Sequence, residues 1–144
     1  MGTDIAFADV VAGIGVTIAT YTQALDDGRT EDVVATFCPD GSTDMSGLGR
    51  HAGHDALREA YGRITPRQPQ RHLVLNTAVT AWDDHEAQAT SDVVLLLYGE
   101  GKWTVALVGR YHDVLHHDGV AWRFHSRVAE FTPPPVAREP KERT

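Results

Sequence analysis

The sequence predicts an α+β domain, in which a cone-shaped, curved antiparallel sheet wraps around a long N-terminal helix with two shorter helices beside it. Two observations carry this prediction. Residues before position 65 place apolar side chains at helical spacing, whereas residues 70–131 form four long runs of β character. Short, turn-rich links join these runs, which is typical of neighbouring antiparallel strands.

The helices are predicted from spacing and from the residues that end them. The long helix is expected over residues 5–25, where steps of three and four residues place one set of apolar side chains on one face: Val10, Ile14, Ile18, Tyr21 and Leu25. Gly28 follows it and is typical of the residue just after a helix. Shorter helices are expected at residues 31–37 and 53–64, and Pro39-Asp40-Gly41 marks a turn after the first of these.

The strands are predicted mainly in the second half of the chain. A short strand is expected over residues 42–47, and the four long runs are 70–82, 86–98, 102–116 and 120–131. Val93–Tyr98 is apolar on both faces, so we expect this part of the sheet to be covered on both sides. Helices can cover one side, and the simplest cover for the other is a second copy of the chain. The sequence therefore predicts a homodimer through the outer face of the sheet.

Composition limits the class of protein. The chain has 144 residues, enough for one domain over residues 1–132, and the proline-rich, charged residues 133–144 are expected to be disordered. With 20 acidic and 13 basic side chains and a net charge of −7, no basic patch indicates a nucleic-acid partner. No signal peptide or membrane span is expected. The single cysteine, Cys38, excludes an intramolecular disulfide and fits a cytoplasmic location.

Five segments, in their order and spacing, resemble the SnoaL-like branch of the nuclear transport factor 2-like superfamily. They are Tyr21–Gly28, Val33–Phe37, Arg71-His72, Gly109-Arg110-Tyr111 and Ala121–Phe124. The resemblance covers about residues 5–131 and implies the same α+β cone. The superfamily includes scytalone dehydratase, bile-acid dehydratase, polyketide cyclases, ketosteroid isomerase and non-catalytic members. It therefore implies a dehydratase-type lyase, with an isomerase or cyclase, or a ligand-binding domain without catalysis, as alternatives.

The same resemblance implies a catalytic set of Tyr21, Asp26 and His72 that needs no cofactor or metal. His72 would take a proton next to a carbonyl group and return it to the leaving hydroxyl group. Asp26 would orient the imidazole, and the Tyr21 hydroxyl would donate to the developing enolate oxygen. The region Val93–Leu97 lacks the second catalytic histidine of scytalone dehydratase, which counts against a scytalone-like substrate.

Each of these residues also has a structural interpretation. Tyr21 lies on the apolar stripe of the helix, Asp26 stands in a turn before Gly28, and His72 can bond to the backbone of its strand. Tyr21 and Asp26 lie five residues apart, which is about 140° around an ideal helix. The three groups therefore converge on one pocket only if Asp26 lies at a turned helix end.

The expected substrate is a small hydrophobic hydroxy-carbonyl compound with a polyketide-like or steroid-like skeleton, held in an apolar pocket at the open end of the cone. Val74 and Asn76 share the face of His72 at the two-residue period of a strand, so we expect both to line this pocket. Asp92 is a candidate second carboxylate in the pocket, or simply a residue at a strand edge.

A metal site is not expected from the sequence. His112 and His116 would share one face of a strand, with His117 next to them, but a solvated hairpin is the favoured interpretation of this cluster. Cys38 has no evident base near it in the sequence, and we interpret it as a buried structural thiol.

Overall fold

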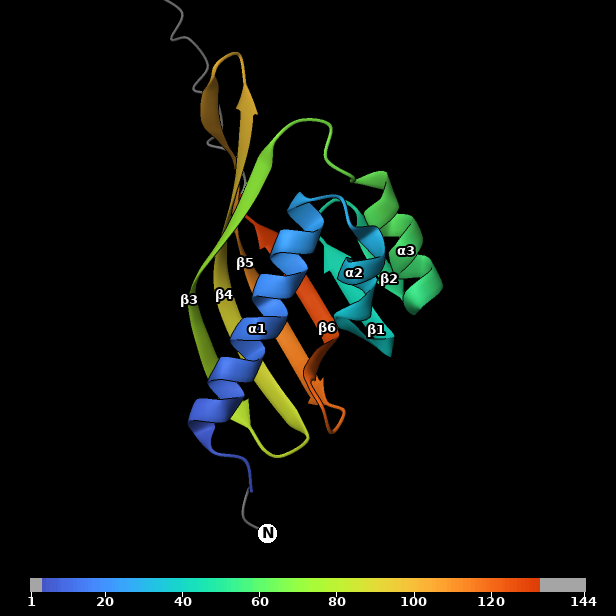
Figure 1. Ribbon diagram of the computed structural model, residues 1–144, viewed down its shortest axis with the longest axis vertical. Helices are drawn as coiled ribbons and strands as arrows, with labels where there is room; N and C mark the ends of the chain where they lie inside the picture. Colours follow the sequence, from blue (N-terminus) through green and yellow to red (C-terminus); the bar gives the residue numbers. More distant parts are fainter. Residues whose placement is uncertain (1–3, 133–144) are drawn as a thin grey trace, which may run out of the picture.

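The computed structural model describes residues 4–132, so the predicted disordered tail, 133–144, lies outside the described residues. The described residues form three helices and six strands (Figure 1). In chain order the elements are α1 (Phe7–Asp26), α2 (Thr30–Ala35), β1 (Phe37–Met45), β2 (Gly49–Ala52), α3 (His54–Arg63), β3 (Gln70–Trp82), β4 (Glu86–Gly99), β5 (Lys102–His117) and β6 (Trp122–Phe131). The α+β cone is confirmed, and the four long strands lie within two residues of their predicted ends.

The sheet is mixed rather than purely antiparallel. Its strand order is β2-β1-β6-β5-β4-β3, and the last four strands of the chain form the expected antiparallel meander. β1, however, runs parallel to β6. The antiparallel prediction is wrong at this junction because β1 meets β6 through a long crossover, and only a short hairpin link forces two neighbouring strands into opposite directions.

The first half of the chain differs most from prediction. The second helix ends at Ala35, two residues early, and Phe37 begins β1 instead. The turn signal around Pro39 falls inside β1, where the ladder to β6 is interrupted between Phe37 and Ser42. The sequence predicted only the regular end of this strand, and it did not predict β2, which is four residues long.

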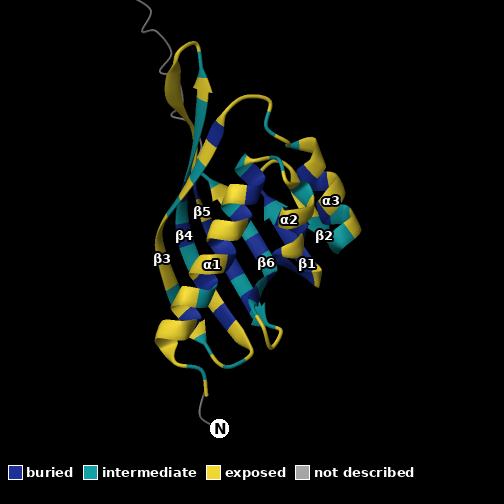
Figure 2. Cartoon of the chain, viewed as in Figure 1, coloured by how far each residue is buried: buried dark blue, intermediate teal, exposed yellow. Residues whose placement is uncertain are grey.

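α1 lies across the concave face of the sheet and buries the predicted apolar stripe (Figures 1 and 2). Gly28 has a φ of +71°, and the N–H groups of Gly28 and Arg29 donate to the carbonyl oxygens of Leu25 and Ala24. These two bonds are the pattern that ends helices at a left-handed glycine. They fix Asp26 as the last residue of the helix, facing β3.

β3 contains an irregularity that changes which side chains face the helix. The register to β4 shifts between Leu75 and Ala78, and Asn76 lies there with a φ of +54°. Such a bulge breaks the strict alternation of faces along a strand. His72 and Val74 therefore face α1 before the bulge, and Thr77 faces α1 after it.

The outer face of the sheet carries exposed apolar side chains. Leu73 and Leu75 alternate with the helix-facing residues of β3 and are 41% and 48% exposed, and Val108 on β5 is also exposed. Val93, at the start of the doubly apolar run, is buried. The homodimer through this face stays a prediction, which analytical ultracentrifugation at micromolar concentration would test.

Among residues 4–132, no helix combines the length and the apolar character needed to cross a lipid bilayer. The cytoplasmic location stays a prediction.

Candidate active site

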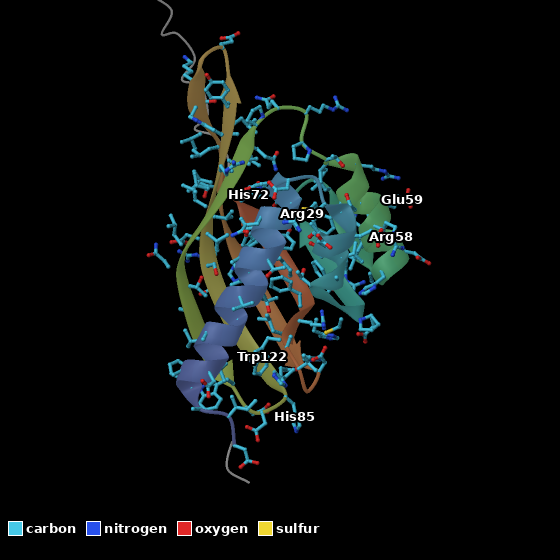
Figure 3. All side chains as sticks on the ribbon, in the orientation of Figure 1. Arg29, Arg58, Glu59, His72, His85 and Trp122 are labelled. Atoms are coloured by element: carbon cyan, nitrogen blue, oxygen red, sulfur yellow. The ribbon has the colours of Figure 1, made fainter. Side chains whose placement is uncertain are left out.

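Asp26 and His72 meet although 46 residues separate them in the chain. Asp26 is the last residue of α1, and His72 lies on β3, the strand at one edge of the sheet (Figure 3). The His72 ring nitrogen Nδ1 lies 2.6 Å from Asp26 Oδ1, and the His72 backbone N–H donates to Asp26 Oδ2 at 2.8 Å. The side chains are only 14% and 5% exposed, so water screens this interaction poorly.

The carboxylate of Asp26 is held in its ionised form. Burial opposes ionisation and raises the pKa, but the hydrogen bonds from the His72 ring and amide, together with one from Gln70 Nε2 at 3.1 Å, outweigh it. The pKa of Asp26 therefore lies below its ordinary value. A carboxylate in this state can only accept hydrogen bonds.

This acceptor fixes the tautomer of the imidazole. Because Asp26 accepts, His72 must donate from Nδ1, and the lone pair of a neutral ring then lies on Nε2. The backbone bond and the ring bond hold His72 to the same carboxylate, so the orientation of the ring is set at two points. The pair has the arrangement of a general base with its orienting acid.

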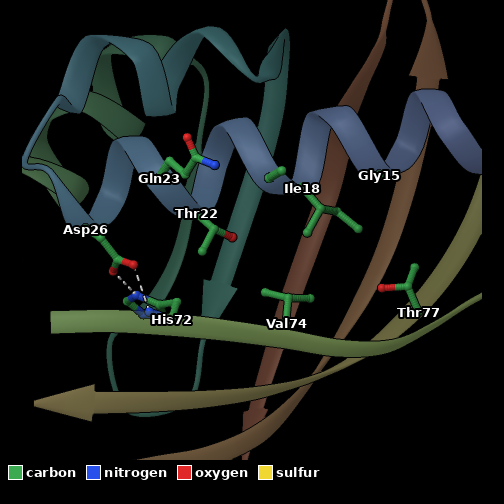
Figure 4. A pocket seen from close by; sticks show the side chains of 9 residues that line it. Gly15, Ile18, Thr22, Gln23, Asp26, His72, Val74 and Thr77 are labelled. Carbon is green, nitrogen blue, oxygen red and sulfur yellow. Dashed lines mark hydrogen bonds and ion pairs between the residues drawn. The ribbon is translucent and has the colours of Figure 1, made fainter. Parts of the chain in front are cut away.

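A cavity of about 380 Å³ opens beside this pair, between α1 and β3 (Figure 4). Asp26 and His72, together called the dyad, lie at one end of the cavity, and Gly15 and Thr77 lie at the other. The full lining is Gly15, Ile18, Ala19, Thr22, Gln23, Asp26, His72, Val74 and Thr77. The α1 residues in this set recur every three or four positions, so they form a second face of the helix beside the buried stripe.

Thr22 is a cavity residue that the sequence analysis missed. It stands four residues before Asp26 and therefore on the same face of α1. Its hydroxyl oxygen is buried and has no hydrogen-bond partner within residues 4–132. Gln23, Gln70 and Thr77 were also missed, and the four-residue spacing from Asp26 was the signal that could have found Thr22.

Tyr21 does not reach this cavity. Its side chain is 2% exposed and points into the core, where its hydroxyl lies 2.9 Å from the hydroxyl of Tyr61. Burial raises the pKa of Tyr21 well above its ordinary value. Because Asp26 keeps its helical position, the wide angle between the two residues around α1 persists. The prediction that all three groups converge is therefore wrong for Tyr21.

The three predicted substrate-binding residues divide between the two faces of the sheet. Val74 lines the cavity beside His72, as predicted. Asn76 instead donates to Asp92 Oδ2 at 2.9 Å, and Asp92 pairs with Arg110, outside the residues that line the cavity. The bulge in β3 carries Asn76 to the outer face, so the prediction that Asn76 and Asp92 line the pocket is wrong.

Solved structures of other proteins share this fold. Rv3472 from Mycobacterium tuberculosis, of unknown function, is 22% identical with a TM-score of 0.81, over 90% of this chain and 80% of that chain. A protein from Novosphingobium aromaticivorans, proposed to be a scytalone dehydratase, is 22% identical with a TM-score of 0.77, over 88% and 86%. ActVI-ORFA from Streptomyces coelicolor is 21% identical with a TM-score of 0.77, over 85% and 97%. At these identities the likeness shows the fold alone.

No curated protein matches the chain. The profile of the SnoaL-like domain matches residues 8–128, which include α1 without its first residue, all six strands except the last three residues of β6, and both Asp26 and His72. The chain therefore belongs to the family of SnoaL-like domains.

Proposed function

We propose that this protein is a cofactor-independent lyase that removes water from a small hydroxy-carbonyl compound with an apolar skeleton. One observation carries the proposal: Asp26 holds the His72 ring through Nδ1 at 2.6 Å, at one end of a cavity between α1 and β3. A histidine whose second nitrogen is fixed by a buried carboxylate is a suitable base for proton abstraction near neutral pH.

The reaction needs one proton transfer to the ring and one from it. His72 Nε2 takes the proton from the carbon next to the carbonyl group, and the ionised Asp26 stabilises the imidazolium that forms. The electron pair of the broken C–H bond forms the enolate. When this collapses, the new C=C bond forms, the C–O bond to the hydroxyl group breaks, and the imidazolium returns its proton to the departing oxygen. The products are one unsaturated carbonyl compound and one water molecule.

Thr22 takes the place that the sequence analysis assigned to Tyr21. Thr22 lines the cavity, and rotation of its side chain would let its buried, unpartnered hydroxyl donate a hydrogen bond to the carbonyl oxygen of the substrate. Such a bond strengthens as negative charge develops on that oxygen during proton abstraction. A hydroxyl that finds no protein partner gains more from a ligand than one that must first give up a bond.

The cavity favours a compact substrate. Its volume of about 380 Å³ lies near the lower end of the range typical of small-molecule sites. Ile18, Ala19 and Val74 give it an apolar wall. Thr22 and Gln23 lie near the dyad, whereas Thr77 lies at the far end. The same proton abstraction would begin an isomerisation or a cyclisation, so the mass of the product distinguishes the reactions.

The test is turnover of a panel of cyclic β-hydroxy ketones, followed by mass spectrometry. We expect a product lighter by one water molecule, and we expect His72→Ala and Asp26→Asn to lower its rate by roughly 10²–10⁴-fold. His85→Ala is the matched control, because His85 is an exposed histidine in the turn after β3, and it should leave the rate unchanged. A product of unchanged mass would replace dehydration with isomerisation. Binding without any product, or turnover that survives both dyad substitutions, would contradict the proposal.

A further inference from the structure

Three metal-binding side chains gather at a place far from the dyad in the sheet. Cys38 on β1, His116 on β5 and His125 on β6 each offer one donor atom, and these three atoms all lie within 4.8 Å of one another. The rings of His116 and His125 stack, with their centroids 4.2 Å apart and their planes 12° apart. The cluster joins β1 to the hairpin of β5 and β6, which lies far from β1 in the chain.

The cluster lies on the outer face of the sheet. Phe37, Leu115 and Phe124 are buried in the core, and each immediately precedes one member of the cluster. Because successive side chains of a strand point to opposite faces, the three ligand candidates point away from the core and from α1. The cluster is therefore separate from the cavity between α1 and β3.

An interruption in both ladders of β6 builds this cluster. On one side, β1 pairs at Phe37 with Phe124 and next at Ser42 with Ser126, so four residues of β1 oppose the single residue His125. On the other side, β5 pairs at Leu115 with Phe124 and at Val114 with Ser126, which again leaves His125 without a partner in the register. Bulges of this kind redirect a side chain and are frequent beside functional sites.

Gly41 allows β1 to fold closely around this bulge. A Cβ atom at Gly41 would lie only 2.6 Å from the carbonyl oxygen of Phe124 and 3.0 Å from that of Cys38. A larger residue would therefore push the Cys38 segment away from His125. The Pro39-Asp40-Gly41 turn signal thus has a specific structural role in bringing a thiol to two imidazoles.

The hydrogen bonds of the two histidines leave donor atoms available. His116 Nε2 lies 2.9 Å from Glu86 Oε2, and since a carboxylate only accepts, the ring donates from Nε2 and keeps a lone pair on Nδ1. The Nδ1 atom of His125 is buried and makes no hydrogen bond to any residue between positions 4 and 132. Its nearest acidic neighbour is Asp40, at 4.0 Å. A buried ring nitrogen without a partner is unfavourable unless a ligand satisfies it.

From this arrangement we propose that Cys38, His116 and His125 bind a zinc ion that ties β1, β6 and β5 together. Thiolate sulfur and imidazole nitrogen are both ligands that Zn²⁺ takes in proteins, and a water molecule or the Asp40 carboxylate can complete four-coordination. Glu86 supplies the carboxylate that metal-bound imidazoles commonly hold through their second nitrogen. A tetrahedral zinc ion holds its donors roughly 3.5 Å from one another, so the two stacked imidazoles must rotate out of their parallel arrangement for both lone pairs to point at one ion. The thiol proton leaves to solvent as the metal binds.

This cluster differs from the one that the sequence suggested. Of the three clustered histidines in β5, only His116 takes part, since His112 lies 3.4 Å from Glu130 and the His117 ring packs against Trp122. The partners of His116 come from other strands, and no spacing in the sequence indicates them. The expectation that Cys38 is only a structural thiol is replaced by this proposal.

The test uses the full chain without an affinity tag, reduced and freed of metal with a chelator. Zn²⁺ is titrated in competition with a chromophoric chelator, and Co²⁺ is titrated separately to observe absorption from a thiolate–metal bond. We expect one equivalent of Zn²⁺ to bind with submicromolar affinity, and we expect Cys38→Ser and His125→Asn each to weaken binding by more than about 100-fold. His112→Asn is the matched control, a histidine on the same face of the same strand, and it should bind as the wild type does.

The Co²⁺ spectrum keeps the test decisive even if a substitution prevents folding, because the wild-type protein alone must show the thiolate band. Weak or non-stoichiometric binding of Zn²⁺ by the wild type would overturn the proposal. So would a Co²⁺ complex without thiolate absorption, or affinity that Cys38→Ser and His125→Asn leave unchanged in variants that fold.

Discussion

Asp113 and Asp26 each hold a basic side chain, and the two pairs differ in what surrounds them. Asp113 accepts two hydrogen bonds from Arg127, at 2.9 and 3.1 Å, with side-chain exposures of 0% and 1%. The Arg127 guanidinium also lies over the rings of Tyr21, Tyr111 and Phe124, at 3.7 to 4.4 Å from their centroids. Asp26 and His72 form an equally close pair, but theirs borders a cavity.

The difference shows what separates a structural pair from a candidate for chemistry. The Arg127 pair is enclosed by aromatic rings and does not line the cavity, although Arg127 Nη1 also lacks a hydrogen-bond partner among the described residues. The His72 pair leaves one ring nitrogen for a ligand, and the neighbouring Thr22 hydroxyl is also without a partner within residues 4–132. Tyr21 belongs to the enclosed pair, which explains why its place in the predicted catalytic set is wrong.

The largest expected effect comes from breaking the enclosed pair. Arg127→Met leaves the Asp113 carboxylate buried without its partner, and we expect it to lower the free energy of unfolding by about 3–5 kcal/mol. The double variant with Asp113→Leu should recover much of this loss, because it removes both charges. Urea unfolding followed by circular dichroism measures both.

Arg110→Met is the control for this prediction. Arg110 pairs with Asp92 at the surface and is 60% exposed, so its loss should cost less than about 1 kcal/mol. If Arg127→Met and Arg110→Met lowered the free energy of unfolding equally, burial of the ion pair would not determine its contribution to stability.

The next largest effect on stability is expected at Gly13, which lies on the side of α1 that packs against Trp122. A Cβ atom at Gly13 would lie 2.7 Å from Trp122 Cδ1, closer than side-chain atoms pack. We therefore expect Gly13→Ala to lower the free energy of unfolding by about 1–3 kcal/mol, despite the better helix propensity of alanine. Thermal unfolding measures this, and a variant more stable than the wild type would disprove the close packing.

The pH dependence of stability tests the Asp26–His72 pair, which borders the cavity. Burial raises the pKa of Asp26, but the hydrogen bonds from His72 and Gln70 lower this pKa by more than burial raises it. The folded protein therefore favours the carboxylate more than the unfolded chain does. This stabilisation is complete above the unfolded pKa of about 4 and is lost as the pH falls through the lower folded value. We expect stability to fall more steeply in that window for the wild type than for Asp26→Asn. Parallel urea-unfolding profiles between about pH 3 and 6 would count against the ionised dyad.

The smallest effect is expected at the far end of the cavity. A Cβ atom at Gly15 would meet no atom within 4 Å among the described residues, so Gly15→Ala should stabilise the protein by up to about 1 kcal/mol through helix propensity. It is the counterpart of Gly13→Ala in the same helix. Gly15→Ala should raise the free energy of unfolding, whereas Gly13→Ala should lower it. A loss of stability in Gly15→Ala would show that the space beside α1 is filled.

The elements of the fold could be predicted because each leaves a periodic pattern in the sequence. The apolar stripe of α1 and the four β runs separated by turn residues are local signals, and tertiary packing did not override them. The pairing of β1 with β6 was not predictable in this way, because it joins distant segments through a crossover. The same holds for β2, which is too short to show a period.

The candidate site could be predicted only in part, for geometric reasons. Asp26 and His72 were found through a resemblance in their spacing, whereas Tyr21 has the right residue type on the wrong face of the helix. Asn76 was misplaced because a bulge in β3 reverses the face, and the sequence has no glycine or proline at that bulge to indicate it. The cluster around His125 depends on two register shifts and was equally hidden.

The most direct test of the dyad is NMR of the two isotope-labelled ring nitrogens of His72, with and without a bound β-hydroxy ketone. We expect the neutral ring to carry its proton on Nδ1, this tautomer preference to be lost in Asp26→Asn, and ligand binding to shift the Nε2 resonance. A ring protonated on Nε2, or an Nε2 resonance that ligand binding leaves unchanged, would contradict the assignment of His72 as the base.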